Sequence, residues 1–212
     1  MRAIVLSGGG SKGAYQIGVW KALRKLNISY DIVTGTSVGA LNGALMVQQN
    51  YQISELLWEN INFNMIFDKD IENNPHTFEG MKELLQTYVK AVTNGGMKIK
   101  PLEQLIRKYL DLEQFYNSNI KYGLTTINLS DFKPLTLTKK EIPRDHLVDY
   151  LIASATCFPF FEMKKINQDY YIDGGYFDNL PIDLAISLGA TEVIAVDIGG
   201  KKLFSKEEKK YS

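Results

Sequence analysis

Short apolar runs alternate with amphipathic stretches along the first fifty residues. Arg2–Leu6 is a branched apolar run that a glycine cluster ends, which predicts a buried strand. Apolar residues recur at helical spacing through Ala14–Leu26, and Ile28–Thr34 is a second strand-like run. Val38–Gln49 predicts a helix with a face of small residues. The order strand, helix, strand, helix predicts an α/β fold in which helices cover a parallel sheet.

The middle of the chain has a helical pattern instead. It extends from Ile53 to Leu110, with breaks at Asn73–Pro75 and Asn94–Gly96 and with Pro101 at a first helical position. This predicts a helical insert over about residues 51–118. No catalytic motif lies in the insert. Its aromatic residues would suit the lining of an apolar pocket, but we favour the interpretation that they pack in the core.

Strand patterns return after the insert and alternate again with helical ones. One domain over residues 1–200 accounts for them, and the Lys/Glu-rich residues 201–212 predict a solvated, charged tail. The predicted strands are Tyr122–Leu129, Leu135–Thr138, Tyr170–Ile172 and Glu192–Ile198, and the predicted helices are Arg144–Ala153 and Pro181–Leu188.

Composition narrows the classes of protein to consider. Hydrophobic residues make up 45% of the 212, which excludes wholesale disorder, and 24 basic against 24 acidic residues argue against a nucleic-acid partner. Cys157 is the single cysteine, so an intrachain disulfide is excluded, and we do not expect it to act as a nucleophile. No signal peptide or bilayer-length apolar run is present, which predicts a soluble, cytoplasmic protein.

A glycine-rich loop follows the first predicted strand. It fits G-x-G-x-x-G, a fingerprint of dinucleotide binding, but that interpretation needs an acidic residue at the end of the second strand. Asp31 lies at the start of that strand instead. The backbone N–H groups of such a loop suit an anion, either a phosphate or a transient oxyanion. The loop consists of Gly8, Gly9, Gly10, Ser11, Lys12 and Gly13.

A second motif stands between the second predicted strand and the helix after it. Gly35, Thr36, Ser37, Val38 and Gly39 match G-x-S-x-G, the nucleophile elbow. A serine in such a sharp turn projects its oxygen above the sheet. Glycines two residues before and two after it remove Cβ atoms that would collide with the adjacent helix and strand. Ser37 is therefore the candidate nucleophile.

The candidate base is a carboxylate. His76 and His146 lie in polar surroundings outside the loops that follow core strands, where a base is expected. Asp173 follows the strand Tyr170–Ile172 and precedes Gly174 and Gly175, which allow a tight turn. A carboxylate becomes a useful base toward a serine when burial raises its pKa.

The three motifs, in this order, resemble those of the patatin-like phospholipases, acyl hydrolases with a Ser–Asp dyad. The resemblance covers Ala3 to about Asn50 and Tyr122 to Gly199, and is weakest in the insert. It implies a three-layer α/β/α sandwich with a mostly parallel central sheet. It also implies Ser37 as nucleophile, Asp173 as base and the amides of Gly8 through Gly13 as the oxyanion hole.

The resemblance further implies an enzyme that needs no metal or other cofactor. Its substrates would be acyl esters of lipids, reached by transient contact with a membrane or micelle surface. The alternative is a non-catalytic module that binds a lipid or a protein partner on the same fold. The presence of both dyad residues argues against that alternative.

Overall fold

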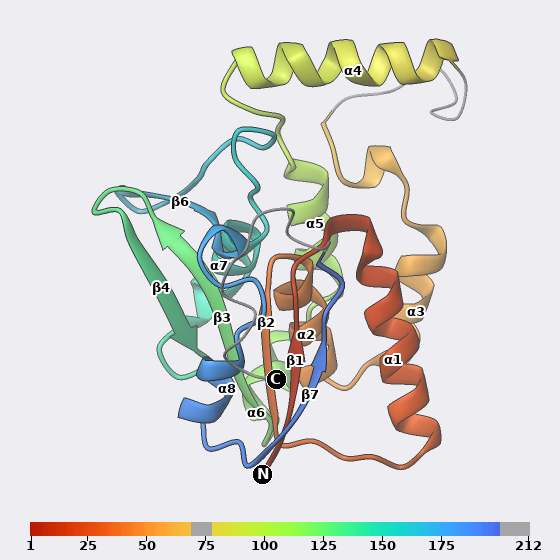
Figure 1. The fold of residues 1–212 in the computed structure, drawn as a ribbon, viewed down its shortest axis with the longest axis vertical. Helices are drawn as coiled ribbons and strands as arrows, with labels where there is room; N and C mark the ends of the chain where they lie inside the picture. The colour runs from red at the N-terminus through yellow and green to blue at the C-terminus, as the bar shows by residue number, and fades with distance from the viewer. Residues whose placement is uncertain (69–77, 200–212) are drawn as a thin grey trace, which may run out of the picture.

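A seven-stranded sheet forms the centre of the computed structural model, which describes residues 1–68 and 78–199 (Figure 1). The predicted break at Asn73–Pro75, His76 and the predicted charged tail at 201–212 lie outside the described residues. The strand order along the main path is β5-β6-β3-β2-β1-β7, with β4 paired to β3.

Four strands form the parallel part of the sheet. β1 lies between β2 and β7, and β2 pairs with β3 on its other side. These strands are β1 (Arg2–Leu6), β2 (Ile32–Thr36), β3 (Lys121–Asn128) and β7 (Glu192–Val196). Because they are parallel, their carboxyl ends lie at one end of the sheet, where the glycine loop and the serine motif follow β1 and β2.

Three antiparallel strands complete the sheet: β4 (Lys133–Thr138), β5 (Lys164–Ile166) and β6 (Asp169–Asp173). β4 occupies one edge of β3 over residues 123–128. Both β2 and β6 must therefore use the other edge of β3, β2 over residues 121–125 and β6 over residues 126–128. The mostly parallel character predicted from the sequence thus holds for the central strands, and the sheet as a whole is mixed.

Helices cover both faces of this sheet, as the predicted sandwich requires. Ala3 and Val5 of β1 pack with Ala185 of α8 on one face, whereas Ile4 and Leu6 belong to the larger core on the other. Six helices contribute to that larger core: α1 (Gly13–Lys25), α2 (Val38–Val47), α3 (Tyr51–Asn60), α5 (Lys100–Tyr109), α6 (Leu112–Asn117) and α7 (Leu147–Ser154). The two other α-helices of the described residues are α4 (Phe78–Thr93) and α8 (Ile182–Ser187).

Five of the six predicted strands have different bounds in the structure, and one strand, β5, is not predicted. β2 begins at Ile32 rather than Ile28, because the Ile28 N–H donates to the Leu23 carbonyl and ends α1. Similarly, the Ile198 N–H leaves the β7 ladder and donates to the Ser7 hydroxyl at 2.8 Å. The sequence does not predict β5, since Lys164 and Lys165 interrupt its apolar pattern.

Two helical glycines give a matched test of how α2 rests on the sheet. A Cβ on Gly39 of α2 would lie 2.3 Å from the Leu6 carbonyl oxygen of β1, whereas a Cβ on Gly18 of α1 would meet nothing within 4 Å. We expect Gly39→Ala to lower the free energy of unfolding by about 1–3 kcal/mol through overpacking. We expect Gly18→Ala to raise it by up to about 1 kcal/mol, because alanine favours the helix.

Urea unfolding followed by circular dichroism measures both values. Equal effects of the two substitutions would contradict the close approach of α2 to β1.

Candidate active site

Ser37 occupies the turn between β2 and α2 with a strained backbone. Its φ of 55° lies in the left-handed region, which non-glycine residues seldom adopt, and its N–H donates to the Ser154 hydroxyl at 2.9 Å. This is the sharp turn that the G-x-S-x-G spacing predicts. Strain of this kind persists only where the surrounding structure fixes the turn, and it is common at active sites.

The neighbouring glycines make the turn possible by close approach. A Cβ on Gly35 would lie 2.3 Å from the Gly39 carbonyl oxygen, and a Cβ on Gly39 would lie 2.3 Å from that of Leu6. Between them, the Thr36 hydroxyl bonds the Thr125 hydroxyl of β3 at 2.7 Å. Val38 is buried and is the first residue of α2. Because it directly follows Ser37, the amino terminus of the helix adjoins the turn.

Ser37 and Asp173 meet because β2 and β6 end against each other on β3. β2 runs parallel to β3 and ends with Thr36 opposite Thr125. β6 runs antiparallel to β3 and ends with Asp173 opposite the next residue, Thr126. The carboxyl ends of both strands therefore converge on one edge, which brings the candidate nucleophile beside the candidate base.

The Asp173 carboxyl group is buried and hydrogen-bonded. Asp173 as a residue is 5% exposed, and its Oδ1 accepts the Gly175 N–H at 2.7 Å. Burial raises the pKa of this carboxyl to about 6, while hydrogen bonds from the Ser37 side chain and the Gly175 N–H oppose the rise. The raised pKa makes the carboxylate a stronger base than an exposed aspartate.

The Asp-Gly-Gly sequence is fixed by contact with β3 and with helix α7. A Cβ on Gly174 would lie 2.4 Å from the Thr125 carbonyl oxygen, so only glycine fits there. The Asp173 N–H donates to the Thr156 carbonyl, just beyond α7, at 2.8 Å. Gly174 and Gly175 then enter a short 3-10 helix, which turns the chain away from the carboxylate.

The glycine loop lies directly against the serine. A Cβ on Gly8 would be 3.0 Å from the Ser37 Cβ. Three of the six loop amides already have acceptors, because Gly8 donates to Asn179, Lys12 to Gly9 and Gly13 to Gly10.

The remaining N–H groups, those of Gly9, Gly10 and Ser11, meet no protein acceptor in the part of the chain that the structure describes. The predicted set of six donors is therefore narrowed to these three, since an N–H that is already donated is not free to bind an oxyanion. Gly10 has a φ of 56°, and the space around its Cα is open.

Asn179 holds the loop in place, and sequence reasoning did not predict this role. Its carbonyl accepts the Gly8 N–H at 3.1 Å, and its Nδ2 donates to the Gly8 carbonyl at 3.3 Å. Asn179 also approaches Gly175, where a Cβ would lie 2.9 Å from its Oδ1. One side chain thus bridges the glycine loop and the Asp-Gly-Gly turn. Its only signal is a polar residue shortly before Pro181.

A buried polar network beneath the loop was also not predicted. The Gln16 amide donates to the Ser7 carbonyl at 2.7 Å, and the Asn42 amide donates to Gln16 at 2.8 Å and to the Gly13 carbonyl at 3.0 Å. The Trp58 indole N–H completes it by donating to Asn42 at 2.9 Å. The visible signal is a polar residue on the apolar stripe of each helix, Gln16 in α1 and Asn42 in α2.

His146 belongs to a different cluster. Its Nδ1 lies 3.0 Å from Asp149, which also binds Lys164 at 3.1 Å and Arg107 at 2.8 Å. Glu103 joins the two cations from the other side, so the charges close into a ring that ties α5, α7 and β5 together. The structure thus pairs His146 with Asp149, and that His146 is not the base stays a prediction.

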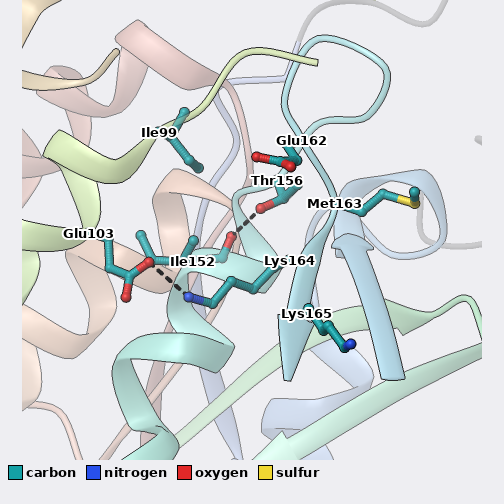
Figure 2. Close-up of a pocket in the computed structure, with 8 residues that line it drawn as sticks. All are labelled: Ile99, Glu103, Ile152, Thr156, Glu162, Met163, Lys164 and Lys165. Carbon is teal, nitrogen blue, oxygen red and sulfur yellow. Dashed lines mark hydrogen bonds and ion pairs between the residues drawn. The ribbon is translucent and has the colours of Figure 1, made fainter. Parts of the chain in front are cut away.

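This ring borders a pocket of about 290 Å³, drawn in Figure 2. Glu103 and Lys164 form one side of it, and Thr156 forms part of the wall. The residues that line it include neither Ser37 nor Asp173, and Thr156 connects it to the candidate site through the hydrogen bond from the Asp173 N–H. The pocket is therefore adjacent to the candidate site and separate from it.

The structure also bears on the other features considered from the sequence: the lone cysteine, a ribose-binding acid, a metal site and a membrane span. Burial raises the pKa of the Cys157 thiol, which keeps it in the less nucleophilic neutral form. Asp31 accepts the Arg2 N–H at the amino end of the sheet, opposite the glycine loop, so it cannot hold a ribose there. Among the described residues, no group of His, Cys, Asp or Glu is arranged to hold a metal ion. None of the described helices has the length and apolarity to span a bilayer.

Comparison with known proteins identifies the family. The family model described as patatin-like phospholipase matches residues 4–186. The chain belongs to the patatin-like phospholipase family. The patatin-like fold is supported by VipD from Legionella pneumophila, which has a TM-score of 0.58 at 16% identity over 85% of this chain and 47% of VipD.

Curated relatives share the patatin-like sequence over nearly the whole chain. Patatin-like phospholipase domain-containing protein 7 from Rattus norvegicus is 29% identical over 206 residues, covering 94% of this chain and 14% of the relative. Lysophospholipase nte1 from Aspergillus terreus is 27% identical over 202 residues, covering 92% of this chain and 12% of the relative. The chain thus spans about one seventh of the rat relative. Membership of this family supports lipid acyl hydrolysis as the general class of activity, without specifying the reaction.

Burial of the charged Asp173 carboxylate should make the folded protein less stable at neutral pH, although the charged form is the one that can act as a base. Its pKa rises from 3.8 to about 6 on folding, so the wild type loses stability as pH increases from about 4 to 6. Asn at this position carries no charge and loses nothing over that interval. We expect Asp173→Asn to gain up to about 3 kcal/mol over the wild type at pH 7, and much less below pH 4.

Thermal and urea unfolding at a series of pH values test this expectation. A stability difference that does not change between pH 4 and pH 7 would rule out the raised pKa.

Proposed function

We propose that this protein is a serine hydrolase that cleaves fatty acyl esters of lipids through a Ser37–Asp173 dyad. The observation that carries the proposal is the convergence of β2 and β6 on one edge of β3, which leaves Ser37 and a buried carboxylate as neighbours. Membership of the patatin-like phospholipase family, with a lysophospholipase among the relatives, supports the lipid ester as substrate class.

In the acylation step, Ser37 Oγ attacks the ester carbonyl carbon and Asp173 takes the hydroxyl proton. The tetrahedral intermediate then collapses, the carbon–oxygen bond to the lipid alcohol breaks, and Asp173 returns the proton to the departing alcohol oxygen. A water molecule repeats the sequence on the acyl-serine, with Asp173 again as base, and releases the fatty acid. The raised pKa of Asp173, about 6, brings the base closer to neutral pH than an ordinary aspartate.

The negative charge of the intermediate needs donors that are in place before the reaction. We assign these donors to the N–H groups of Gly9, Gly10 and Ser11, which lack acceptors within the described residues and follow a glycine in contact with Ser37. Donors fixed by the fold cost no reorganisation when the charge develops. Lys12 is excluded from this set, because its N–H already donates to the Gly9 carbonyl at 3.3 Å. Its Nζ donates to the Ile198 carbonyl at 3.3 Å and supports the loop from outside.

The dyad predicts a specific pattern of losses. Ser37→Ala and Asp173→Asn should each lower kcat for a p-nitrophenyl ester by at least about 10³, and the double variant should lose little more, because the residues act as a unit. In the wild type, kcat/KM should fall about tenfold per pH unit below pH 6, where Asp173 is protonated. A fluorophosphonate probe should label Ser37 covalently in the wild type and in neither dyad variant.

His146→Ala is the control, since its side chain pairs with Asp149 outside the site. A folded His146→Ala variant that loses activity by orders of magnitude would refute the dyad. Absence of both hydrolysis and labelling in folded wild type would favour the non-catalytic lipid- or partner-binding module.

The oxyanion assignment predicts a kinetic effect at Gly10. A methyl group has room at this position, but a φ of 56° disfavours any side chain, so Gly10→Ala should fold and re-aim the loop amides. We expect kcat to fall by about 10² with little change in KM, because an oxyanion donor acts mainly in the transition state.

Lys12→Ala is the comparison within the same loop. Its Nζ bonds outside the donor set, so this variant should change KM more than kcat. Steady-state kinetics on one ester distinguish the two patterns. A kinetically silent, folded Gly10→Ala variant would contradict the assignment.

A further inference from the structure

Helix α4 lies across the end of the molecule at which β1 and β2 finish (Figure 1). That end also carries the glycine loop and Ser37, which directly follow these two strands. None of the α4 side chains that the structure describes belongs to a hydrophobic core. The helix therefore lies over the end of the sheet that carries the candidate site.

The sequence of α4 is amphipathic, and part of its apolar side meets solvent. Apolar residues recur through its 16 residues at intervals of three and four. Leu85 and Val89, one turn apart, are 62% and 53% exposed. Neighbouring exposed apolar side chains on one helix are costly in water unless another surface covers them.

The chain beyond α4 connects the helix to the acid motif. The Met97 N–H donates to the Phe160 carbonyl at 2.8 Å, and the Glu162 N–H donates back to Met97 at 3.0 Å. Phe160 is itself 39% exposed and stands four residues after Thr156, whose carbonyl holds the Asp173 N–H. A surface that bound α4 would thus lie close to the Asp173 turn.

The charge balance of α4 indicates which kind of surface the helix can bind. Glu79 and Glu83 balance Lys82 and Lys90, and the whole chain has no net charge. A balanced helix gains nothing from a strongly anionic partner, whether nucleic acid or an acidic membrane. Its attraction must come from burial of apolar side chains, which a neutral lipid surface provides to a depth of about 5–10 Å.

We propose that Leu85 and Val89 dock α4 onto the surface of a zwitterionic lipid bilayer and so present Ser37 to acyl esters held there. The choice of a lipid surface rests on the proposed function, since lipid esters are then both the surface and the substrate. Docking by two aliphatic side chains is weak and reversible, which suits an enzyme that must leave the surface after turnover.

Flotation with phosphatidylcholine vesicles tests the docking separately from catalysis. The Ser37→Ala protein, which should leave the lipid intact, is compared with the same protein carrying Leu85→Gln and Val89→Gln. We expect vesicle binding to weaken about tenfold or more on loss of both side chains. Binding of the parent should change little with salt or with added anionic lipid, because the helix is balanced in charge.

Leu26→Gln is the matched control. Leu26 is 68% exposed and directly follows α1, which returns the chain to the amino ends of the strands, away from Ser37. This variant should bind vesicles as the parent does. Equal binding by all three proteins, or equal loss in the Leu85/Val89 and Leu26 variants, would overturn the proposal. So would a change of oligomeric state in the Leu85/Val89 variant without a change in vesicle binding.

A gain-of-binding variant removes the concern that weaker binding reflects misfolding. Val89→Trp should strengthen vesicle binding, because tryptophan favours the membrane interface. With Ser37 restored, the Leu85/Val89 variant should hydrolyse a water-soluble p-nitrophenyl ester at the wild-type rate and vesicle lipid more slowly. Loss of binding without any hydrolysis in the wild type would refute the proposed function alone, whereas hydrolysis with unchanged binding would refute the docking alone.

Discussion

Two strands that run in opposite directions share one edge of β3, and their carboxyl ends meet between Thr125 and Thr126. Backbone hydrogen bonds to β3 fix both strands in register, so the distance between Ser37 and Asp173 is set by the sheet rather than by flexible loops. β4 makes this arrangement unavoidable, because it occupies the opposite edge of β3 over the same residues. The rest of the candidate site is assembled around this junction.

Two unfavourable features are held in place by that junction. Ser37 has a left-handed backbone, and Asp173 keeps its carboxyl group out of water with a raised pKa. Each costs free energy that the surrounding structure must offset: Gly35 and Gly39 by close backbone approach, and Gly175 by donating to the carboxylate. Both features are what a serine hydrolase with a carboxylate base requires, since the serine must project and the carboxylate must be basic.

The glycine loop depends on supports that are distant in sequence. Asn179 bonds Gly8 through two hydrogen bonds, and Lys12 reaches the Ile198 carbonyl. Beneath the loop, the network of Gln16, Asn42 and Trp58 satisfies buried polar groups and fixes α1 against α2. Asn179 accepts the Gly8 N–H, and carbonyls within the loop accept those of Lys12 and Gly13. Among the described residues, this leaves the N–H groups of Gly9, Gly10 and Ser11 as candidate donors.

Much of this could be predicted from the sequence because it is local. Apolar runs and helical spacing identify β1, α1, α2 and β3, and the glycines around Ser37 and after Asp173 mark turns that only glycine allows. β5 escapes prediction because its two lysines carry no strand pattern, and the ion-pair partners of Lys164 come from α5 and α7.

By itself, the sequence determined an α/β fold of the patatin-like type and the three motifs that carry the candidate chemistry, since each depends on neighbours a few residues apart. Only the tertiary structure decided that Ser37 and Asp173, 136 positions apart, become neighbours, which loop amides are already donated, and that α4 lies over the end of the sheet that carries the candidate site. Strand pairing, burial and hydrogen-bond partners are properties of residues distant along the chain, and no local pattern records them.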